Sequence, residues 1–442
     1  MTIAIDIRPL MTAPRTGVGE YTYELLDAIF KIDRSNQYIL FYNSWDDVSA
    51  NIPKWDYTNV QFAGMHYPNK LFNGAMRIFG RPRLDKMVAR YCHCERSETE
   101  RSNPTVEGIA CPQRPQAGLR GGRAASLPAG VPRNDSIDLW FSPNLNFTAL
   151  TPKVKSILTV HDLSFKFFPE FSTAKQFWWH RSVSPKKQCQ RADLVIVPSE
   201  NTKRDIVDYY NIAPEKIKVI YPGVKQFSVL SSQFTADSPR FTVHSSRFTA
   251  DSPQFTVSDI RKKYDLPEKY ILFLGTIEPR KNIIGLIEAF EKLSGGHDLV
   301  IAGAPGWKNS EIFAKAKASI KSNRIKFINF VLPEDKPALY RSAELFVYPS
   351  FYEGFGFPVL EAMAEGTPVI TSNRSSLPEI TGPAAYLIDP SRPEQMTLAM
   401  NELLTQPKLR DWHIQKGLEQ VKKYSWENAA REWLEILQHL NT

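Results

Sequence analysis

The chain has 442 residues, 42% hydrophobic and 23% charged, which is typical of a globular protein with two or three domains. Its formal net charge of +8 fits phosphorylated substrates, anionic membranes or nucleic acids, and does not choose among them. No apolar run reaches the roughly 18–20 residues of a membrane span, and the first residues lack the pattern of a signal peptide. Four cysteines are too few for a disulfide framework. We therefore expect a cytoplasmic protein.

Short apolar runs alternate with helical patterns along most of the chain. In the first half the predicted strands are 2–7, 37–42, 138–142, 156–160, 193–198 and 217–221. In the second half they are 270–274, 298–302, 325–329, 345–348 and 368–371. Helical patterns occupy 21–30, 202–210, 283–293 and 311–320, and a last helix spans 426–440. This alternation predicts an α/β protein with two doubly wound, parallel-sheet domains.

Two stretches interrupt the pattern. Residues 92–136 are rich in Arg, Ser, Pro and Gly and lack periodicity, which predicts a disordered insertion in a first domain of residues 1–225. The cysteines there, Cys92, Cys94 and Cys111, do not have zinc-site spacing. Residues 226–257 contain a segment that occurs twice, and we interpret them as a lengthened linker to a second domain of residues 258–424.

A glycine-rich turn between two carboxylates follows the predicted strand 345–348. It runs Glu353-Gly354-Phe355-Gly356-Phe357-Pro358-Val359-Leu360-Glu361. Glycines before a helix let backbone amides approach an anion, and the helix dipole favours that charge. We expect Glu353 at the mouth of a cleft and Glu361 one helical turn further in, each binding hydroxyls of an elongated ligand. An ordinary acidic helix start is the alternative interpretation.

A basic pair follows the first strand of the second domain. After Gly275, the chain continues through Glu278 to Arg280 and Lys281 before a predicted helix. Ligands of open parallel sheets bind outside the carboxyl ends of strands, where these two cations could neutralise a diphosphate. The sequence contains no Asp-x-Asp motif of the kind that holds Mg²⁺ or Mn²⁺ on a diphosphate, so we expect no metal cofactor. A solvated basic turn is the alternative.

Three weaker signals lie at strand ends of the first domain. Gly17 and Gly19 stand at a strand-to-helix turn that permits close approach of a phosphate or an acceptor. His161 ends the strand 156–160, and Pro143-Asn144 end another. A packed structural role is about as common for such residues as ligand contact.

Together these segments resemble glycosyltransferase family 4, whose members are retaining enzymes with the GT-B fold: two facing Rossmann-like domains with a cleft between them. The resemblance covers nearly the whole chain outside the two interrupting stretches. The segments that show the resemblance are Glu353-x7-Glu361, Phe273–Thr276 with Arg280-Lys281, Val160-His161-Asp162, Val197-Pro198-Ser199, Tyr221–Val224 and Tyr424–Glu427. The family's last segment, here residues 425–442, packs back on the first domain.

The resemblance implies a hexosyltransferase and a role for each site residue. Arg280 and Lys281 would bind the donor diphosphate, Glu361 the ribose and Glu353 the transferred sugar. His161 would lie beside the anomeric centre. Gly275, Gly354, Phe355 and Gly356 would complete the nucleotide-sugar site, with Gly17 and Gly19 on the phosphate and acceptor side. Likeness to mannosyl- and rhamnosyltransferases makes GDP-mannose the first-choice donor, with a glycan or lipid-linked acceptor in the synthesis of surface polysaccharide, including lipopolysaccharide.

Residues 70–79 mix apolar and basic side chains and predict a surface that rests on anionic lipid. Four further cations follow, Arg81, Arg83, Lys86 and Arg90, and the aromatic residues 177–179 could add a contact. An amphipathic surface helix is the alternative. Other activities stay open for the chain as a whole: a phosphorylase, a sugar-nucleotide epimerase, or an inactive binding protein. No recognition helix or RNA motif indicates nucleic acid.

Overall fold

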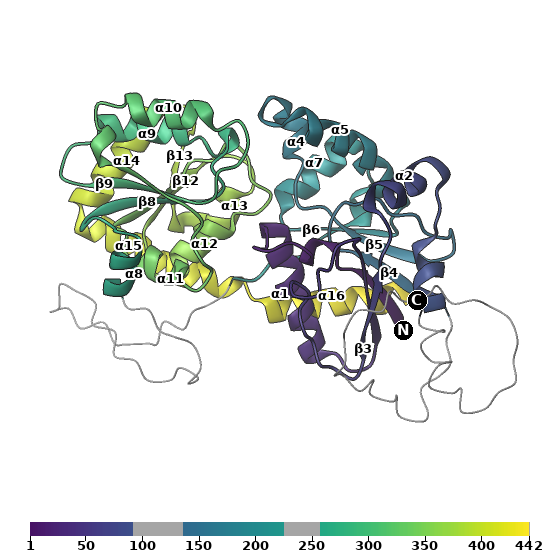
Figure 1. Cartoon of the computed structure of the whole chain (residues 1–442). Helices are drawn as coiled ribbons and strands as arrows, with labels where there is room; N and C mark the ends of the chain where they lie inside the picture. Colours follow the sequence, from purple (N-terminus) through teal and green to yellow (C-terminus); the bar gives the residue numbers. More distant parts are fainter. Residues whose placement is uncertain (92–135, 225–256, 442) are drawn as a thin grey trace, which may run out of the picture.

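The protein folds into two α/β domains that a C-terminal helix connects (Figure 1). The computed structural model describes residues 1–91, 136–224 and 257–441. The predicted insertion and linker, with Cys92, Cys94 and Cys111, therefore lie almost entirely outside the described residues. In the described part of the chain, no helix is long and apolar enough to cross a membrane.

The first domain has a seven-stranded parallel sheet in the order β3-β2-β1-β4-β5-β6-β7. Its strands are β1 Thr2–Asp6, β2 Gln37–Asn43, β3 Val60–Met65, β4 Leu139–Ser142, β5 Lys155–Thr159, β6 Leu194–Val197 and β7 Ile217–Val219. Its helices are α1 Gly17–Ile32, α2 Asn69–Phe79, α4 Ser164–Phe167, α5 Ala174–Val183, α6 Pro185–Arg191 and α7 Glu200–Tyr210, with a further helical segment at 84–91.

The second domain has a six-stranded parallel sheet in the order β10-β9-β8-β11-β12-β13. Its strands are β8 Tyr270–Leu274, β9 Asp298–Ala302, β10 Ile325–Ile328, β11 Leu345–Tyr348, β12 Val369–Ser372 and β13 Tyr386–Ile388. Its helices are α8 Val257–Lys263, α9 Ile283–Lys292, α10 Ser310–Ala318, α11 Lys336–Ser342, α12 Phe357–Ala364, α13 Leu377–Thr381, α14 Pro393–Thr405 and α15 Pro407–Gln420. All five residues of β8 are buried, as expected for a strand with helices on both faces.

Every strand predicted from the sequence is present, and two further strands were missed. β3 contains Gln61 and Gly64, which interrupt the apolar pattern, and it pairs only with β2 at the edge of the sheet. The Tyr42 ring of β2 takes the space beside Gly64, where a Cβ would lie 2.5 Å from it. The other missed strand, β13, is only three residues long. The polar and small residues of β3 explain why it was missed, whereas β13 is no shorter than β7, which was predicted.

Both sheets reverse their strand order at one place, between β1 and β4 and between β8 and β11. At such a switch point the connections leave in opposite directions, so a crevice opens outside the carboxyl ends of the strands. The carboxyl edges of the two sheets meet: Ser199, which follows β6, donates a hydrogen bond of 2.8 Å to the backbone oxygen of Gly354, which follows β11. The predicted pair of Rossmann-like domains that face each other is confirmed.

The last helix, α16 Trp426–Asn441, runs from the second domain across the first and packs on α1 (Figure 1). Trp433 is fully buried, and its ring lies 5.2 Å from that of Phe141 in β4. The chain therefore crosses between the domains twice, and the core of the first domain includes the end of the sequence.

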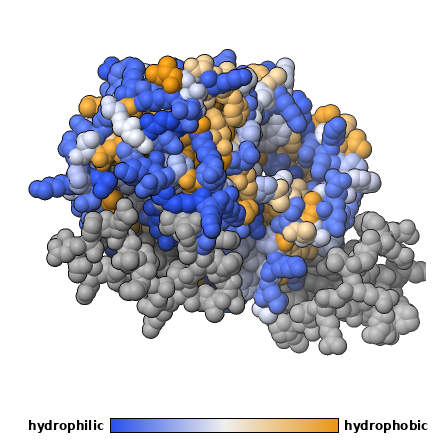
Figure 2. All heavy atoms as spheres, turned by 60° about the vertical axis from the view of Figure 1, so that its left-hand side comes forward, coloured by the Kyte–Doolittle hydropathy of each residue, from blue (hydrophilic) through white to orange (hydrophobic). Residues whose placement is uncertain are grey.

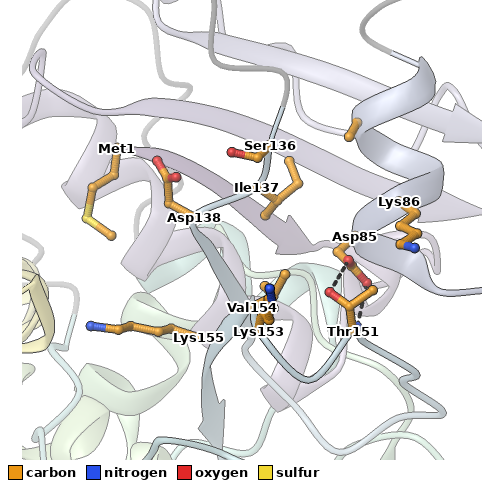
Figure 3. A pocket seen from close by; sticks show the side chains of 11 residues that line it. Met1, Asp85, Lys86, Ser136, Ile137, Asp138, Thr151, Lys153, Val154 and Lys155 are labelled. Carbon is orange, nitrogen blue, oxygen red and sulfur yellow. Dashed lines mark hydrogen bonds between the residues drawn. The ribbon is translucent and has the colours of Figure 1, made fainter.

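A hollow of about 660 Å³ lies at the amino edge of the first sheet (Figure 3). Met1, Asp138 and Lys155 line it at the starts of β1, β4 and β5, and Thr151 there bonds to Asp85. This is the opposite edge from the switch point, so the hollow is not where an α/β sheet binds its ligand. Elsewhere hydrophilic residues cover most of the face in Figure 2, with hydrophobic residues interspersed.

Candidate active site

The pairing of β8 with β11 brings the predicted basic pair to Glu353. Arg280 and Lys281 follow β8 in a short 3-10 turn, and Glu353 follows β11. Glu353 Oε1 lies 3.0 Å from Arg280 Nη1 and 2.6 Å from Lys281 Nζ. The three charged groups form one cluster at the switch point of the second sheet, where the sheet topology favours a ligand.

This cluster is buried and its charges are strongly coupled. The side chains of Arg280, Lys281 and Glu353 are 17%, 8% and 10% exposed. Burial alone would raise the pKa of Glu353, but Arg280 and Lys281 outweigh it and lower the pKa to about 2. Burial and the neighbouring Arg280 charge lower the pKa of Lys281, against the attraction of the carboxylates. Glu353 is thus a fixed anion within a buried cluster.

Two residues that we did not single out complete the cluster. Glu278 is 1% exposed and accepts a 2.6 Å bond from Arg280 Nη2. Its other oxygen, Oε2, is buried without a hydrogen bond among the described residues. Tyr348, the last residue of β11, accepts a 2.5 Å bond from Lys281 Nζ. Glu278 and Glu353 fix both cations against the polypeptide, which leaves little freedom to lose when an anion binds.

Gly354 holds the Glu353 loop directly against the first domain. A Cβ at Gly354 would lie 2.0 Å from the backbone oxygen of His161. Only glycine permits that approach. Ser199, the N-cap of α7, secures the contact because its hydroxyl bonds both to Gly354 and to the Thr202 amide. Gly354, which we predicted to face a phosphate, thus joins the two domains.

His161 follows β5 and is oriented by the strand beside it. Its Nε2 lies 2.9 Å from the backbone oxygen of Pro143, which follows β4. A carbonyl can only accept, so Nε2 carries the proton and Nδ1 of the neutral ring is an acceptor. Burial lowers the pKa of His161 and so favours that neutral form. The ring packs edge-on against Tyr21 of α1 at 4.7 Å.

The glycines at the two strand-to-helix turns have different surroundings. Gly17 is the first residue of α1, and a Cβ there would meet nothing within 4 Å. Gly19 donates its amide hydrogen to the side chain of the N-cap Thr16, and a Cβ there would lie 3.1 Å from the backbone oxygen of Pro9.

At Gly275 a Cβ would make ordinary contacts, whereas at Gly303, beside it, a Cβ would lie 1.9 Å from the Gly275 oxygen. The crowded glycine is therefore Gly303, which the sequence did not indicate.

The rest of the predicted Glu353–Glu361 segment divides between core and surface. Phe355 is 5% exposed and packs on Phe357 and Tyr424, so it can offer a ligand only its backbone. Gly356 has a φ of +119° as the N-cap of α12, which requires glycine. Glu361 is 25% exposed and accepts a 2.9 Å bond from Tyr340 of α11.

Further contacts between the domains surround this site. Glu379 of α13 accepts bonds from the backbone amides of Glu200 and Asn201, at 2.7 and 3.0 Å, at the start of α7. The Tyr352 hydroxyl bonds to Asp205 of α7. These pairs depend on how the domains dock, so no local sequence pattern indicates them.

The arrangement has matches among known sequences. A family profile described as "Glycosyltransferase Family 4" matches residues 91–226, and one described as "Glycosyl transferases group 1" matches residues 257–420. The O-antigen chain mannosyltransferase B of Escherichia coli is 30% identical over 283 residues, 63% of this chain and 68% of that protein. The serotype-specific mannosyltransferase WbdA of Escherichia coli is 29% identical over 248 residues, 54% of this chain and 28% of WbdA.

Solved structures show the same fold at lower identity. Sucrose-phosphate synthase from Thermosynechococcus elongatus superposes with a TM-score of 0.64 at 17% identity, over 100% of this chain and 99% of that one. HepE of Anabaena, solved in complex with UDP and glucose, superposes with a TM-score of 0.61 at 15% identity, over 99% and 100% of the two chains.

Two facing parallel-sheet domains whose carboxyl edges meet have the GT-B fold, and the matched families make the protein a glycosyltransferase of that fold. Within that class, this chain belongs to glycosyltransferase family 4. The predicted fold and family are confirmed.

Proposed function

We propose that this enzyme is a retaining hexosyltransferase that moves mannose from GDP-mannose to a glycan or lipid-linked acceptor in the synthesis of surface polysaccharide, such as lipopolysaccharide. The names of the Escherichia coli relatives support mannose and O-antigen chains, and HepE in complex with UDP and glucose supports a nucleotide-sugar donor. The observation that carries the proposal is the buried Arg280–Lys281–Glu353 cluster against the His161 strand end.

In this proposal the cluster binds the donor. Arg280 and Lys281 hold the diphosphate, Arg280 by its two-pronged guanidinium and Lys281 as a point charge. Glu353 contacts hydroxyls of the transferred sugar and also keeps both cations oriented. Glu361 binds the ribose. Backbone groups of Gly275, Gly354, Phe355 and Gly356, with Gly17 and Gly19 across the site, complete the enclosure.

The chemistry follows from where charge develops. As the bond from the sugar C1 to the diphosphate breaks, the sugar becomes cationic and the leaving group gains negative charge. Arg280 and Lys281 are already in place to stabilise that charge, so no metal is needed and little reorganisation occurs. The acceptor hydroxyl attacks C1 on the face that the diphosphate leaves, and its proton passes to a leaving phosphate oxygen. Neither Glu353 nor His161 acts as a covalent nucleophile; the neutral His161 ring lies beside C1 with Nδ1 as an acceptor.

A donor panel tests the proposal. Purified enzyme is incubated with GDP-mannose, UDP-glucose and other nucleotide sugars, with released nucleoside diphosphate and thermal stabilisation as the readouts. GDP-mannose is expected to give the largest signal in both, and the product anomer, read by NMR, is expected to match the donor. An inverted anomer would reject retention, and stabilisation without turnover by any donor would indicate a binding protein.

The enzyme is further proposed to work on the cytoplasmic face of an anionic membrane. Leu71, Ile78 and Phe79 of α2 are each 73% exposed beside the exposed cations Lys70 and Arg77. Such a face combines apolar insertion with attraction to anionic headgroups. Trp178 of α5 is 61% exposed and can add to it.

Not all of the predicted basic residues take part in that face. Arg83 turns inward to the backbone oxygen of Leu150, and Lys86 lines the hollow at the amino edge of the sheet. Flotation with phosphatidylglycerol vesicles at low salt tests the membrane contact: binding that does not depend on vesicle charge, or no binding, would reject it.

A further inference from the structure

A second hollow, of about 290 Å³, lies in the first domain between α2 and the α5–α6 pair. The buried residues Met76 and Val183 form its apolar part, and Phe147 and Thr148 also line it. α2 and α5 are far apart in sequence but lie at the same end of the domain (Figure 1).

The hollow is lined by charge of one sign. Arg77 comes from α2, Arg181 from α5, and Lys187 and Arg191 from α6. All four are exposed, and no carboxylate lines the hollow. None of the four has an ion-pair partner in the described ranges. Cations that converge without a counter-charge concentrate anions locally, and arginine forks match phosphate geometry.

A fixed loop links this hollow to the active site. Residues 143–147 leave β4, and Pro143 accepts the His161 bond described above. Four residues on, the Phe147 oxygen accepts a 2.9 Å bond from Arg8, while Gln188 of α6 bonds to the Asn146 oxygen at 2.8 Å. Four residues span at most about 14 Å. Phe147, which lines the hollow, therefore lies within about 14 Å of Pro143, the hydrogen-bond partner of His161.

We propose that this hollow binds a phosphoryl group carried by the acceptor, so that the acceptor of this enzyme is a phosphate- or diphosphate-linked glycan on a lipid. This inference rests on the proposed function and specifies its acceptor. The phosphoryl group binds between the four cations, and the sugar end of the acceptor extends along residues 143–147 to His161. The exposed side chains of Ile78, Phe79 and Trp178 beside the cations accommodate the lipid.

Binding of farnesyl diphosphate, measured by titration calorimetry with farnesol as the uncharged reference, tests the site. The double variant Arg181→Gln/Arg191→Gln is expected to bind farnesyl diphosphate at least about tenfold more weakly than wild type. As the salt concentration rises, the affinity of wild type is expected to fall more steeply than that of the double variant. Lys186→Gln is the matched control, because Lys186 is an exposed cation of α6 that does not line the hollow, and it is expected to bind as wild type does. Matching thermal midpoints show that all variants fold.

The donor site also binds diphosphates, so the Arg280→Ala variant separates the two. Farnesyl diphosphate binding that survives in Arg280→Ala supports the acceptor site, and binding lost there but kept in the double variant overturns it. Equal affinity for farnesol also overturns it, because the apolar side chains would then suffice. If the double variant loses flotation with phosphatidylglycerol vesicles but keeps its affinity for farnesyl diphosphate, the cations serve membrane headgroups and the proposal is wrong. None of these measurements uses turnover, so their outcome stands whatever the donor panel shows.

Discussion

Replacement of Gly354 by alanine perturbs the junction between the domains without touching a charged group. The added Cβ would lie 2.0 Å from the His161 oxygen and 2.8 Å from the Asp162 Cβ, whereas real Cβ atoms stay beyond 3.0 Å. The first of these contacts is with backbone, which cannot rotate away. The Glu353 loop and the end of β5 must therefore separate by about 1 Å.

A shift of this size has consequences for both binding and catalysis. The 2.8 Å bond from Ser199 to the Gly354 oxygen would be stretched or lost. A misplacement of about 1 Å can cost about 100-fold in rate, or roughly 2.7 kcal/mol in the activation free energy. Crowding of the junction costs a further 1–3 kcal/mol, roughly, in stability.

The assay is kcat/KM for donor turnover, with thermal unfolding as the folding control. Gly354→Ala is expected to lower kcat/KM about 100-fold while the protein stays folded. Gly296→Ala is the matched control, because a Cβ at Gly296 would meet nothing within 4 Å, and it is expected to leave kcat/KM unchanged. A Gly354→Ala variant with the kcat/KM of wild type would refute the close approach of the domains at His161.

Three further outcomes are expected. Chelation with EDTA should leave turnover unchanged, and a loss that Mg²⁺ restores would contradict cation-based donor binding. Burial raises the pKa of Glu365 to about 7, although the nearby Arg341 lowers it. The stability that this carboxyl contributes is therefore present below its ordinary pKa of 4.5 and is lost as the pH rises through 7. The free energy of unfolding of wild type relative to Glu365→Gln, from urea titrations, should therefore fall between pH 5 and 8 by up to roughly 3 kcal/mol. Parallel pH profiles of the two proteins would disprove this. Trp433→Ala should lower the free energy of unfolding, measured in urea titrations, by roughly 3–5 kcal/mol, because Trp433 is fully buried against the first domain. A loss below about 1 kcal/mol would mean that α16 does not anchor there.

The sequence predicts the sheets well because buried parallel strands are continuous apolar runs. The run at β8 is entirely apolar and entirely buried, and its bounds are read without error. β3 was missed because an edge strand needs fewer apolar residues. Its Gly64 has no side chain, and the Tyr42 ring from the next strand fills the space beside it. Local composition therefore determines the central strands and the edge strands β7 and β10, but not the edge strands β3 and β13.

The site is less predictable because its contacts depend on strand pairing. Arg280 and Glu353 are each indicated by their own segment, yet their ion pair exists only because β11 lies next to β8 although β9 and β10 intervene in sequence. Glu278 could have been noticed, since an acid two residues before Arg280 is placed to pair with it. The bonds of Glu379 to the start of α7 require the docked domains, so no segment alone encodes them.

The most direct test of the central claim is a titration of wild type, Arg280→Ala, Lys281→Ala and Glu353→Ala with the donor that the panel identifies, followed by single-turnover kinetics. If fixed cations hold the diphosphate, each cation variant binds the donor about tenfold or more weakly. Glu353→Ala slows transfer more than it weakens binding. Full turnover and unchanged donor affinity in all three variants would contradict the account.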